Sequence, residues 1–335
     1  VRNRARIVSN LRPTLKLIEA DSTGKRKGEP VVLVADNIVG EGDSLFVAWG
    51  TVTIDRSDIL ARGDSANLDN TRQFSRLMKR PYIESKGKDA FTLRGLVIDM
   101  FGRNRAIERV VAMDSGVAVN KDLTLASDTI DLRIRENKLQ RAYAFGPGAA
   151  SAVTRERTIL ADSIDVRMPN QQLREMYAVR QAYAESDPDS VKVRSAERDW
   201  LRGDTIVARF DSLPATDTTS KPKIRDLLAS GFASSYYQVP NSKDAKKPGI
   251  NYVKGRQIIV DFKAQDVQTV TVVDSASGIF LEALPDSVAS DSARGAARAR
   301  RPTRRPAAGT GTTPGGRAPR PGAGTRRQPN AIRRP

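Results

Sequence analysis

The sequence of 335 residues predicts an all-β protein: a repetitive, solenoid-like stack of bent strands followed by a disordered, basic C-terminal tail. Two features predict the stack: an eight-residue pattern that recurs along the chain, and a second apolar segment that follows it at a fixed distance. A third feature, the density of Arg, Pro, Gly, Ala and Thr near the C-terminus, predicts the tail, because such a composition buries too little apolar surface to fold.

The recurring octad has an apolar residue or Ala first, a small residue third, usually an acidic residue fourth, and apolar residues at positions six and eight. Its starts lie 28, 32, 32, 34, 42 and 52 residues apart, as expected for stacked supersecondary units. The seven copies are Leu33-Val-Ala-Asp-Asn-Ile-Val-Gly40, Ala61-Arg-Gly-Asp-Ser-Ala-Asn-Leu68, Leu93-Arg-Gly-Leu-Val-Ile-Asp-Met100, Leu125-Ala-Ser-Asp-Thr-Ile-Asp-Leu132, Ile159-Leu-Ala-Asp-Ser-Ile-Asp-Val166, Leu201-Arg-Gly-Asp-Thr-Ile-Val-Ala208 and Val253-Lys-Gly-Arg-Gln-Ile-Ile-Val260.

A second apolar segment begins 14 residues after four of these starts. In the repeat that starts at Leu201, an insertion between Ser212 and Pro222 displaces this segment to Ile224. Insertions into stacked repeats fall in loops. The four segments in register are Ile107-Glu-Arg-Val-Val-Ala112, Leu139-Gln-Arg-Ala-Tyr-Ala144, Leu173-Arg-Glu-Met-Tyr-Ala178 and Val267-Gln-Thr-Val-Thr-Val272.

Both segments are predicted to be strands, because their apolar residues alternate over short stretches and no helical period persists for three turns. Octad positions one and three are odd and positions six and eight are even. In a straight strand, odd and even side chains point to opposite faces of the sheet. A bend at the small third residue, such as Gly63 or Gly203, is predicted to turn both halves toward one interior. Each repeat then has two bent strands joined by a polar turn, stacked as an antiparallel meander or as a parallel coil.

The apolar positions are expected to line a long, narrow interior. Taken singly, each side chain is expected to be ordinary packed core. Taken together on an open-sided stack, they would form a continuous apolar groove, which marks a lipid or partner site. The candidate lipid-binding residues are Ile130, Leu132, Ile164, Val166, Met176, Ile206, Ile258, Val260, Val270 and Val272.

The bent two-strand repeats, the small residue followed by Asp, and the phrase Ala48-Trp-Gly-Thr-Val-Thr-Ile54 resemble the OstA/LptA-like (organic solvent tolerance-like) domain of bacterial lipopolysaccharide transport. The resemblance divides the chain into an N-terminal arm at 1–30, an OstA-like β-repeat domain at 31–284 and the tail at 285–335. It implies a β-jellyroll folded lengthwise like a taco, whose interior carries acyl chains. It also implies the periplasm, or the periplasmic face of the outer membrane, as the location.

The partners that the resemblance implies are lipopolysaccharide or a similar glycolipid, and other transport-bridge proteins that join by pairing of edge strands. A second copy of the chain is a further partner to test. The function expected is non-catalytic binding and transport of the glycolipid through an apolar groove. The alternative is a structural β-solenoid with a dry interior, a scaffold or surface protein that associates with itself edge to edge.

Composition argues against an enzyme and against cofactors. The chain has no Cys and no His, which removes disulfides, thiol nucleophiles, imidazole bases and the usual zinc ligands. Outside the repeat columns the sequence shows no cluster of carboxylates or basic residues of the kind catalysis needs. The sequence contains no apolar run of 18 residues, so no membrane-spanning helix is predicted. The chain starts at Val1, so a leader or anchor is expected upstream.

The acidic column at octad position four raises the question of a metal site, because carboxylates bind Ca²⁺. An Asp after a small residue also satisfies backbone N–H groups at a bend, and this explanation is preferred, so no metal site is expected. The two Arg-Gly-Asp tripeptides, at 62–64 and 202–204, fall at octad positions two to four and are explained by the repeat.

Residues 286–335 carry 12 Arg and 2 Asp, so 12 − 2 = +10 of the formal net charge of +17 lies there. Such a segment can contact anions such as the phosphates of a glycolipid, or it can serve as a solubilising tether. Nucleic acid is not an expected partner, because the tail lacks interleaved aromatic residues and no recognition motif accompanies it.

Overall fold

A computed structural model describes residues 6–18, 29–42, 44–87, 90–103, 106–212, 222–241, 247–264 and 266–282. The chain divides into two compact units, Val1–Ala283 and Leu284–Pro335. All the described residues belong to the first unit. The predicted tail and most of the insertion between Ser212 and Pro222 lie outside them.

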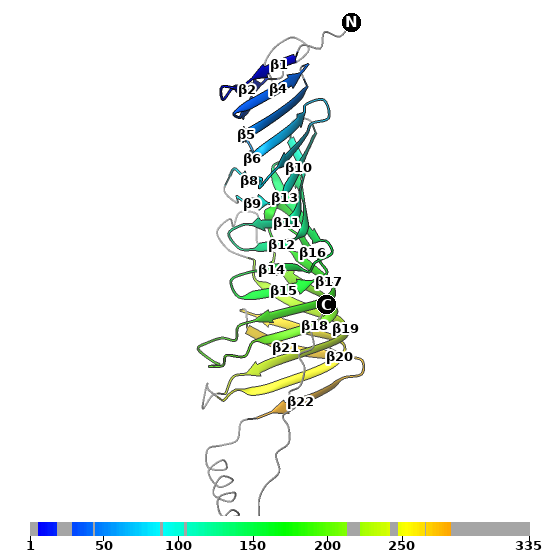
Figure 1. Cartoon of the computed structure of the whole chain (residues 1–335). Helices are drawn as coiled ribbons and strands as arrows, with labels where there is room; N and C mark the ends of the chain where they lie inside the picture. Colours follow the sequence, from blue (N-terminus) through cyan, green and yellow to red (C-terminus); the bar gives the residue numbers. More distant parts are fainter. Residues whose placement is uncertain are drawn as a thin grey trace, which may run out of the picture. The chain divides into compact units, whose positions relative to one another are not determined.

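The described part of the chain is built from strands, apart from one 3-10 turn, η1 (Pro169–Gln171) (Figure 1). The all-β prediction is therefore confirmed. The strands are β1 (Arg6–Ser9), β2 (Thr14–Leu17), β3 (Val31–Val34), β4 (Asn37–Glu41), β5 (Leu45–Asp55), β6 (Ile59–Asp69), β7 (Phe74–Met78), β8 (Tyr82–Ser85), β9 (Thr92–Arg94), β10 (Val97–Arg103), β11 (Ala106–Val119), β12 (Thr124–Arg135), β13 (Lys138–Phe145), β14 (Ala150–Val153), β15 (Arg157–Ala161), β16 (Ser163–Arg167), β17 (Glu175–Ser186), β18 (Asp199–Phe210), β19 (Ile224–Val239), β20 (Gly249–Lys263), β21 (Asp266–Val273) and β22 (Ser277–Leu281).

The strands form one 22-stranded sheet in which all the described pairings are antiparallel. Consecutive strands pair as a meander, for example β17 with β18, β18 with β19 and β19 with β20. This pairing decides between the two stackings left open by the sequence, because a coil of repeats would pair parallel strands. The segment assigned to an N-terminal arm contributes two short strands: β1 pairs with β4, and β2 pairs with β3.

The strands bend, but one residue later than predicted. In β18, Gly203 still pairs with Ala182 and Thr205 pairs with Val179, so Asp204 alone opposes Arg180 and Gln181. Both opposing residues have positive φ, 63° and 50°. Two left-handed residues thus turn one strand around a single residue of its neighbour, as in a β-bulge. The same arrangement sets Asp64 against Gly50 and Thr51, Asp128 against Asp114 and Ser115, and Arg256 against Gly231 and Phe232.

The small residue at octad position three has a packing reason instead. A Cβ added to Gly203 would lie 2.8 Å from the carbonyl oxygen of Ser230, and one added to Gly95 would lie 3.0 Å from that of Met113. The backbone of the neighbouring strand therefore approaches too closely for a larger side chain. The bend at position four and the small residue at position three are two parts of one corner.

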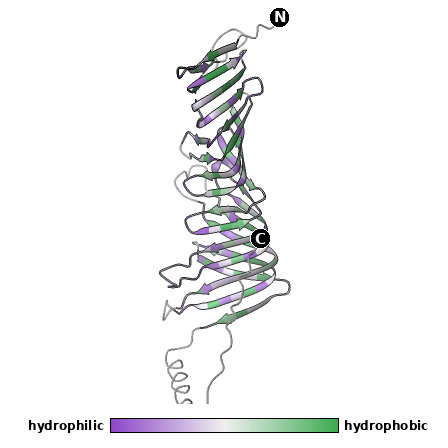
Figure 2. Ribbon diagram, viewed as in Figure 1, coloured by the Kyte–Doolittle hydropathy of each residue, from purple (hydrophilic) through white to green (hydrophobic). Residues whose placement is uncertain are grey.

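The corners divide the sheet into two walls. We call wall A the part formed by octad positions one to three with their paired strands, and wall B the part formed by positions five to eight with theirs. Side chains of both walls belong to one hydrophobic core. Hydrophobic and hydrophilic residues alternate along the strands (Figure 2), as expected for a sheet with one buried face.

Large and small side chains alternate along the inner face of wall B. Cross-strand register places an Ala between successive Ile residues, so the branched side chains have room to interdigitate with wall A at native packing density. All seven of these residues are at most 1% exposed. The row runs Ile130, Ala144, Ile164, Ala178, Ile206, Ala229, Ile258.

Candidate lipid-binding cavity

The ten candidate lipid-binding residues all lie on wall B. Eight of them are buried, seven at no more than 1% exposure and Val260 at 8%, while Val270 and Val272 are half-buried. Most belong to the packed core shared by the two walls. Val260 and Val270 line a cavity.

That cavity has a volume of about 750 Å³ and lies between the two walls where β18 to β21 pair. Its apolar lining includes Leu201 on wall A and Leu227, Val260, Val267 and Val270 on wall B. The volume falls in the range of ordinary ligand pockets. The volume is therefore large enough for a small ligand or part of an apolar chain.

Two small side chains of wall A lie beside the cavity. The inner row of wall A passes from Ile159 to Ala184, Leu201 and Ser235 across four adjacent strands. Ala184 and Ser235 both line the cavity. Ala and Ser fill less volume between the walls than the Ile that the first two repeats place at the equivalent position, Ile54 and Ile83, whereas the next two repeats also have Ala there, at Ala118 and Ala152.

Polar groups occupy one side of the cavity. The Asp199 carboxylate accepts hydrogen bonds from the backbone N–H of Gln238 at 2.9 Å and from its Nε2 at 3.3 Å. The same Nε2 donates to the carbonyl oxygen of Glu197 at 2.8 Å. Burial raises the pKa of Asp199 above its ordinary value, and the hydrogen bonds from Gln238 and the positive charge of Arg157 partly oppose this shift.

Arg157 reaches across the same cavity from wall A. Its guanidinium carbon lies 4.4 Å from the ring centroid of Phe262 on wall B. Both residues line the cavity. Burial lowers the pKa of Arg157 from its ordinary value, but an arginine remains cationic at neutral pH.

A loop between β17 and β18, residues 187–198, closes one side of the cavity. Val193 in this loop is 3% exposed and lines the cavity. Lys192 Nζ lies 2.7 Å from Asp266 Oδ2 at the start of β21 and 3.4 Å from Asp189 Oδ2. The loop therefore runs from a strand of wall A to an ion pair with wall B.

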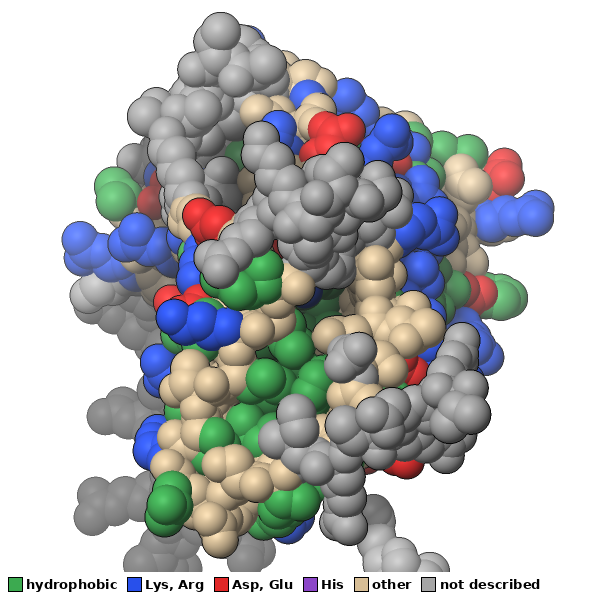
Figure 3. Space-filling model, turned by 90° about the horizontal axis from the view of Figure 1, so that it is seen from above, with side chains coloured by type: hydrophobic (Ala, Val, Ile, Leu, Met, Phe, Trp, Pro, Cys, Tyr) green, Lys and Arg blue, Asp and Glu red, His purple; other side chains and the backbone are tan. Residues whose placement is uncertain are grey.

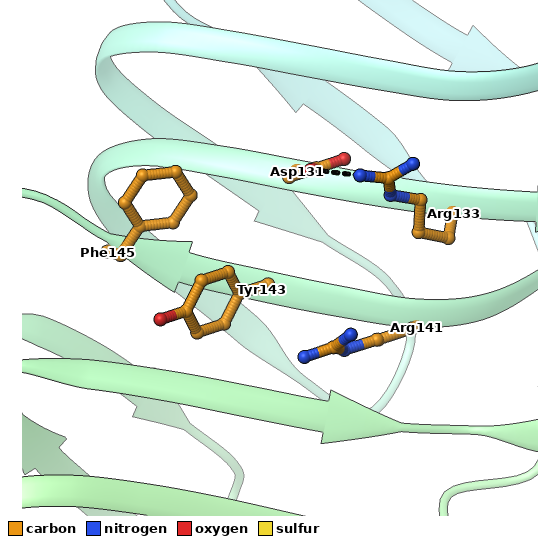
Figure 4. Close-up of a pocket in the computed structure, with 5 residues that line it drawn as sticks. All are labelled: Asp131, Arg133, Arg141, Tyr143 and Phe145. Carbon is orange, nitrogen blue, oxygen red and sulfur yellow. Dashed lines mark hydrogen bonds and ion pairs between the residues drawn. The ribbon is translucent and has the colours of Figure 1, made fainter.

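A second, smaller hollow of about 300 Å³ lies on the outer face of wall B (Figure 4). Its lining residues are Asp131, Arg133, Arg141, Tyr143 and Phe145. Arg133 and Arg141 are directly opposite each other on β12 and β13. Like charges so placed repel unless carboxylates intervene.

Carboxylates do intervene. Asp131 pairs with Arg133 at 3.0 Å and with Arg109 at 2.9 Å. Asp165 pairs with Arg141 and, at 3.3 Å, with Arg167. The hydrogen bond from Arg141 to Asp165 raises the pKa of Arg141. These guanidinium groups already have partners, so the outer hollow is part of a structural ion-pair network.

The sequence-based selection of site residues omitted Arg157, Asp199 and Phe262. A signal for them existed in the alternation of the strands. Arg157 stands two residues before Ile159, and Phe262 stands two residues after Val260, so each shares the inward face of an octad residue. Polar or aromatic residues at these inward positions just outside the octads mark the place where the dry core ends.

No three His, Cys, Asp or Glu side chains in the described ranges cluster closely enough to hold a metal ion. None of the helices in the described part of the chain is long and apolar enough to span a bilayer.

Comparison with known proteins gives one distant similarity. No protein-family model matches the chain, and no curated protein matches it. The chain is similar to a solved structure of LptH from Pseudomonas aeruginosa, which is described as the LptA-homologous periplasmic component of the conserved lipopolysaccharide transport device. The sequence identity is 16%, the match covers 45% of this chain and 96% of LptH, and the TM-score is 0.30.

Proposed function

We propose that this chain binds the acyl part of lipopolysaccharide or a similar glycolipid in the periplasm and passes it on without catalysing a reaction. The observation that carries the proposal is the 750 Å³ cavity between the two walls, floored by Leu227, Val260 and Val270. A partly open cavity of this size, with an apolar floor and polar side chains around it, is a candidate ligand site in a folded domain. The glycolipid class and the periplasmic location come from the resemblance of the repeats to OstA/LptA-like domains.

The geometry supports binding of a chain-like ligand. The cavity continues the apolar interior of the stack, whose core consists mainly of Ile, Leu, Val and Ala. Viewed along the stack, hydrophobic side chains gather in the middle, with Lys and Arg on the flanks (Figure 3). An acyl chain would replace water against this lining and gain roughly 0.8 kcal/mol per buried methylene.

Passing the lipid on requires neighbours at the ends of the stack. Among the described strands, β22 pairs only with β20, and β21 also pairs only with β20. Their other edges present unpaired backbone groups, which can recruit a strand from another chain. We propose that other bridge proteins, or a second copy of this chain, add to the stack at these edges.

Photo-crosslinking tests the lipid proposal. Phe262 inside the cavity is replaced by benzoylphenylalanine, which is aromatic and so preserves much of the ring packing. The matched control is the same replacement at Phe145, an aromatic residue on the outer face. Irradiation with lipopolysaccharide is expected to label the Phe262 variant and leave the Phe145 variant unlabelled. Equal labelling of both variants, or labelling of neither, would contradict the proposal.

The alternative function, a self-associating scaffold, is favoured by one observation. Strand β22 exposes Ile279, Phe280 and Leu281 to 60%, 58% and 56%. Exposed apolar residues on an unpaired edge strand are a site of self-association. If benzoylphenylalanine at Phe280 captures a second copy while the Phe262 variant captures no lipid, the scaffold replaces the transport proposal.

A further inference from the structure

Arg157 has a backbone held in place and a side chain without a polar partner. Its N–H donates to Thr154 Oγ1 at 3.1 Å, and its carbonyl oxygen accepts from the Thr154 N–H at 2.8 Å. Its guanidinium makes no hydrogen bond and no ion pair with any residue in the described ranges. The contact it does make is with the ring of Phe262. The five N–H donors of this guanidinium therefore have no protein acceptor in the described ranges.

The carboxylates that line the same cavity are engaged elsewhere. Asp199 accepts its hydrogen bonds from Gln238. Asp266 is paired with Lys192. The remaining carboxylates around the cavity either pair with other cations or lie at the exposed rim: Glu185 and Asp187 pair with Arg198, Asp189 pairs with Lys192, and Glu156 is exposed. None of them forms an ion pair with Arg157, although the charges of Glu156 and Asp199 act on the guanidinium from a greater distance and partly oppose the lowering of its pKa by burial.

Stacking on Phe262 does not replace a counterion. A guanidinium over an aromatic ring is stabilised by the ring quadrupole, but burying a cation without an ion partner costs more than this contact returns. Buried charges are normally paired. A half-buried guanidinium that has no ion pair and lies beside an open cavity thus has the features of an anion-binding site.

We propose that Arg157 is an anion-binding subsite of the cavity and takes the oxyanion head, phosphate or carboxylate, of an amphiphile. The apolar chain of the ligand lies along Phe262, Val267 and Val270 on wall B. A guanidinium suits this task because its planar fork binds two oxygens of a phosphate or carboxylate at once. The inference rests on the proposed function, and it adds the charge of the ligand and the residue that recognises it.

Calorimetric titration with four probes tests the subsite. Dodecyl phosphate and laurate have an oxyanion head on the same chain, monolaurin has a neutral head, and inorganic phosphate has no chain. Each is titrated below its micelle concentration into the unchanged protein. Dodecyl phosphate or laurate is expected to bind about tenfold or more tightly than monolaurin, as a charge-assisted hydrogen bond in a cavity allows. The tighter of the two identifies the head group.

Variants assign the effect to the residue. Arg157→Gln is expected to weaken the anionic probes about 10- to 100-fold and to leave monolaurin within about twofold. Arg157→Lys, which keeps the charge, is expected to lose less. The control is Arg194→Gln in the loop of residues 187–198, which removes the same charge from an exposed position. This control is expected to change none of the affinities.

The outcomes separate the subsite from the lipid function. If monolaurin binds and the anionic probes bind no better, or if Arg157→Gln weakens all chain-bearing probes equally, the anion subsite is wrong and the apolar cavity stands. If inorganic phosphate binds as tightly as dodecyl phosphate, the apolar chain adds nothing to binding, and the proposal that the ligand is an amphiphile is wrong. If no probe with a chain binds, both this inference and the proposed function are wrong. The comparison among probes needs only the unchanged protein, so a variant that fails to fold does not remove the test.

Discussion

Lys192 Nζ lies 2.7 Å from Asp266 Oδ2, and this ion pair joins a loop that leaves wall A to the first residue of a strand in wall B. The two side chains are 45% and 59% exposed. An exposed pair of this kind contributes about 0 to 1 kcal/mol to stability. Its position, across one side of the cavity, matters more than its strength.

Breaking this ion pair is expected to speed entry into the cavity and to leave the fold unchanged. The Lys192→Ala variant should bind fluorescently labelled lauric acid several-fold faster in stopped-flow measurements, since the loop 187–198 loses its hold on wall B. Its Tm should change by no more than a few degrees, given the small contribution of exposed pairs. Raising the salt concentration should speed entry into the unchanged protein through screening. Identical rates for the variant and the unchanged protein would contradict this role for the loop.

The pH dependence of stability is expected to report on Asp199. Burial raises the pKa of this carboxyl in the folded protein, so the folded state holds the proton more tightly than the unfolded state. Stability from this group is therefore present at low pH and is lost as the pH rises from the unfolded value near 3.9 through the folded value. Asp199→Asn keeps the oxygen that accepts from Gln238 and cannot ionise. Urea unfolding between pH 4 and pH 7 should show the unchanged protein losing stability relative to this variant, and parallel profiles would contradict the prediction.

The corner between the walls is expected to be intolerant of a methyl group at Gly231. This residue has φ +79°, and a Cβ placed on it would overlap the carboxylate of Asp204. Gly231→Ala should cost about 2 to 4 kcal/mol, because the strain of a left-handed residue adds to the steric overlap. Gly42→Ala is the matched control, since Gly42 has φ +62° with nothing within 4 Å of an added Cβ. The control should lower the free energy of unfolding by only about 1 kcal/mol, the cost of a left-handed backbone at a residue with a Cβ.

A second substitution separates the backbone strain at Gly231 from the steric overlap with Asp204. Adding Asp204→Ala to Gly231→Ala removes the overlapping carboxylate and should recover part of the loss in chemical denaturation. If the double variant loses at least as much stability as the sum of the two single changes, the overlap is not the cause.

Deletion of residues 286–335 is expected to leave the strands intact, because the described strands all end before this range. It should also weaken binding to vesicles that contain anionic lipid at low salt, since the segment carries a net charge of +10 from 12 Arg and 2 Asp. Vesicle co-sedimentation at low and high salt measures both effects, and neutral vesicles are the control. Equal binding with and without the segment would leave it the role of a tether.

The repeat pattern was enough to predict the all-β class and the inward residues of the octads. Ile130, Ile164, Ile206 and Ile258 recur at octad position six, and all four are at most 1% exposed. Burial at these positions follows from the local alternation of the strand, which depends only on neighbouring residues. A property set by sequence neighbours can be read from a sequence.

The pairing of the strands and the contents of the cavity came only from the tertiary structure. The octads are equally compatible with parallel and antiparallel stacking, and the bend at Asp204 depends on Arg180 and Gln181 of another strand. Arg157 and Phe262 meet because wall A folds back on wall B. Local alternation shows that each faces inward, but which groups oppose it, and whether a guanidinium finds a counterion, is decided by residues distant in sequence.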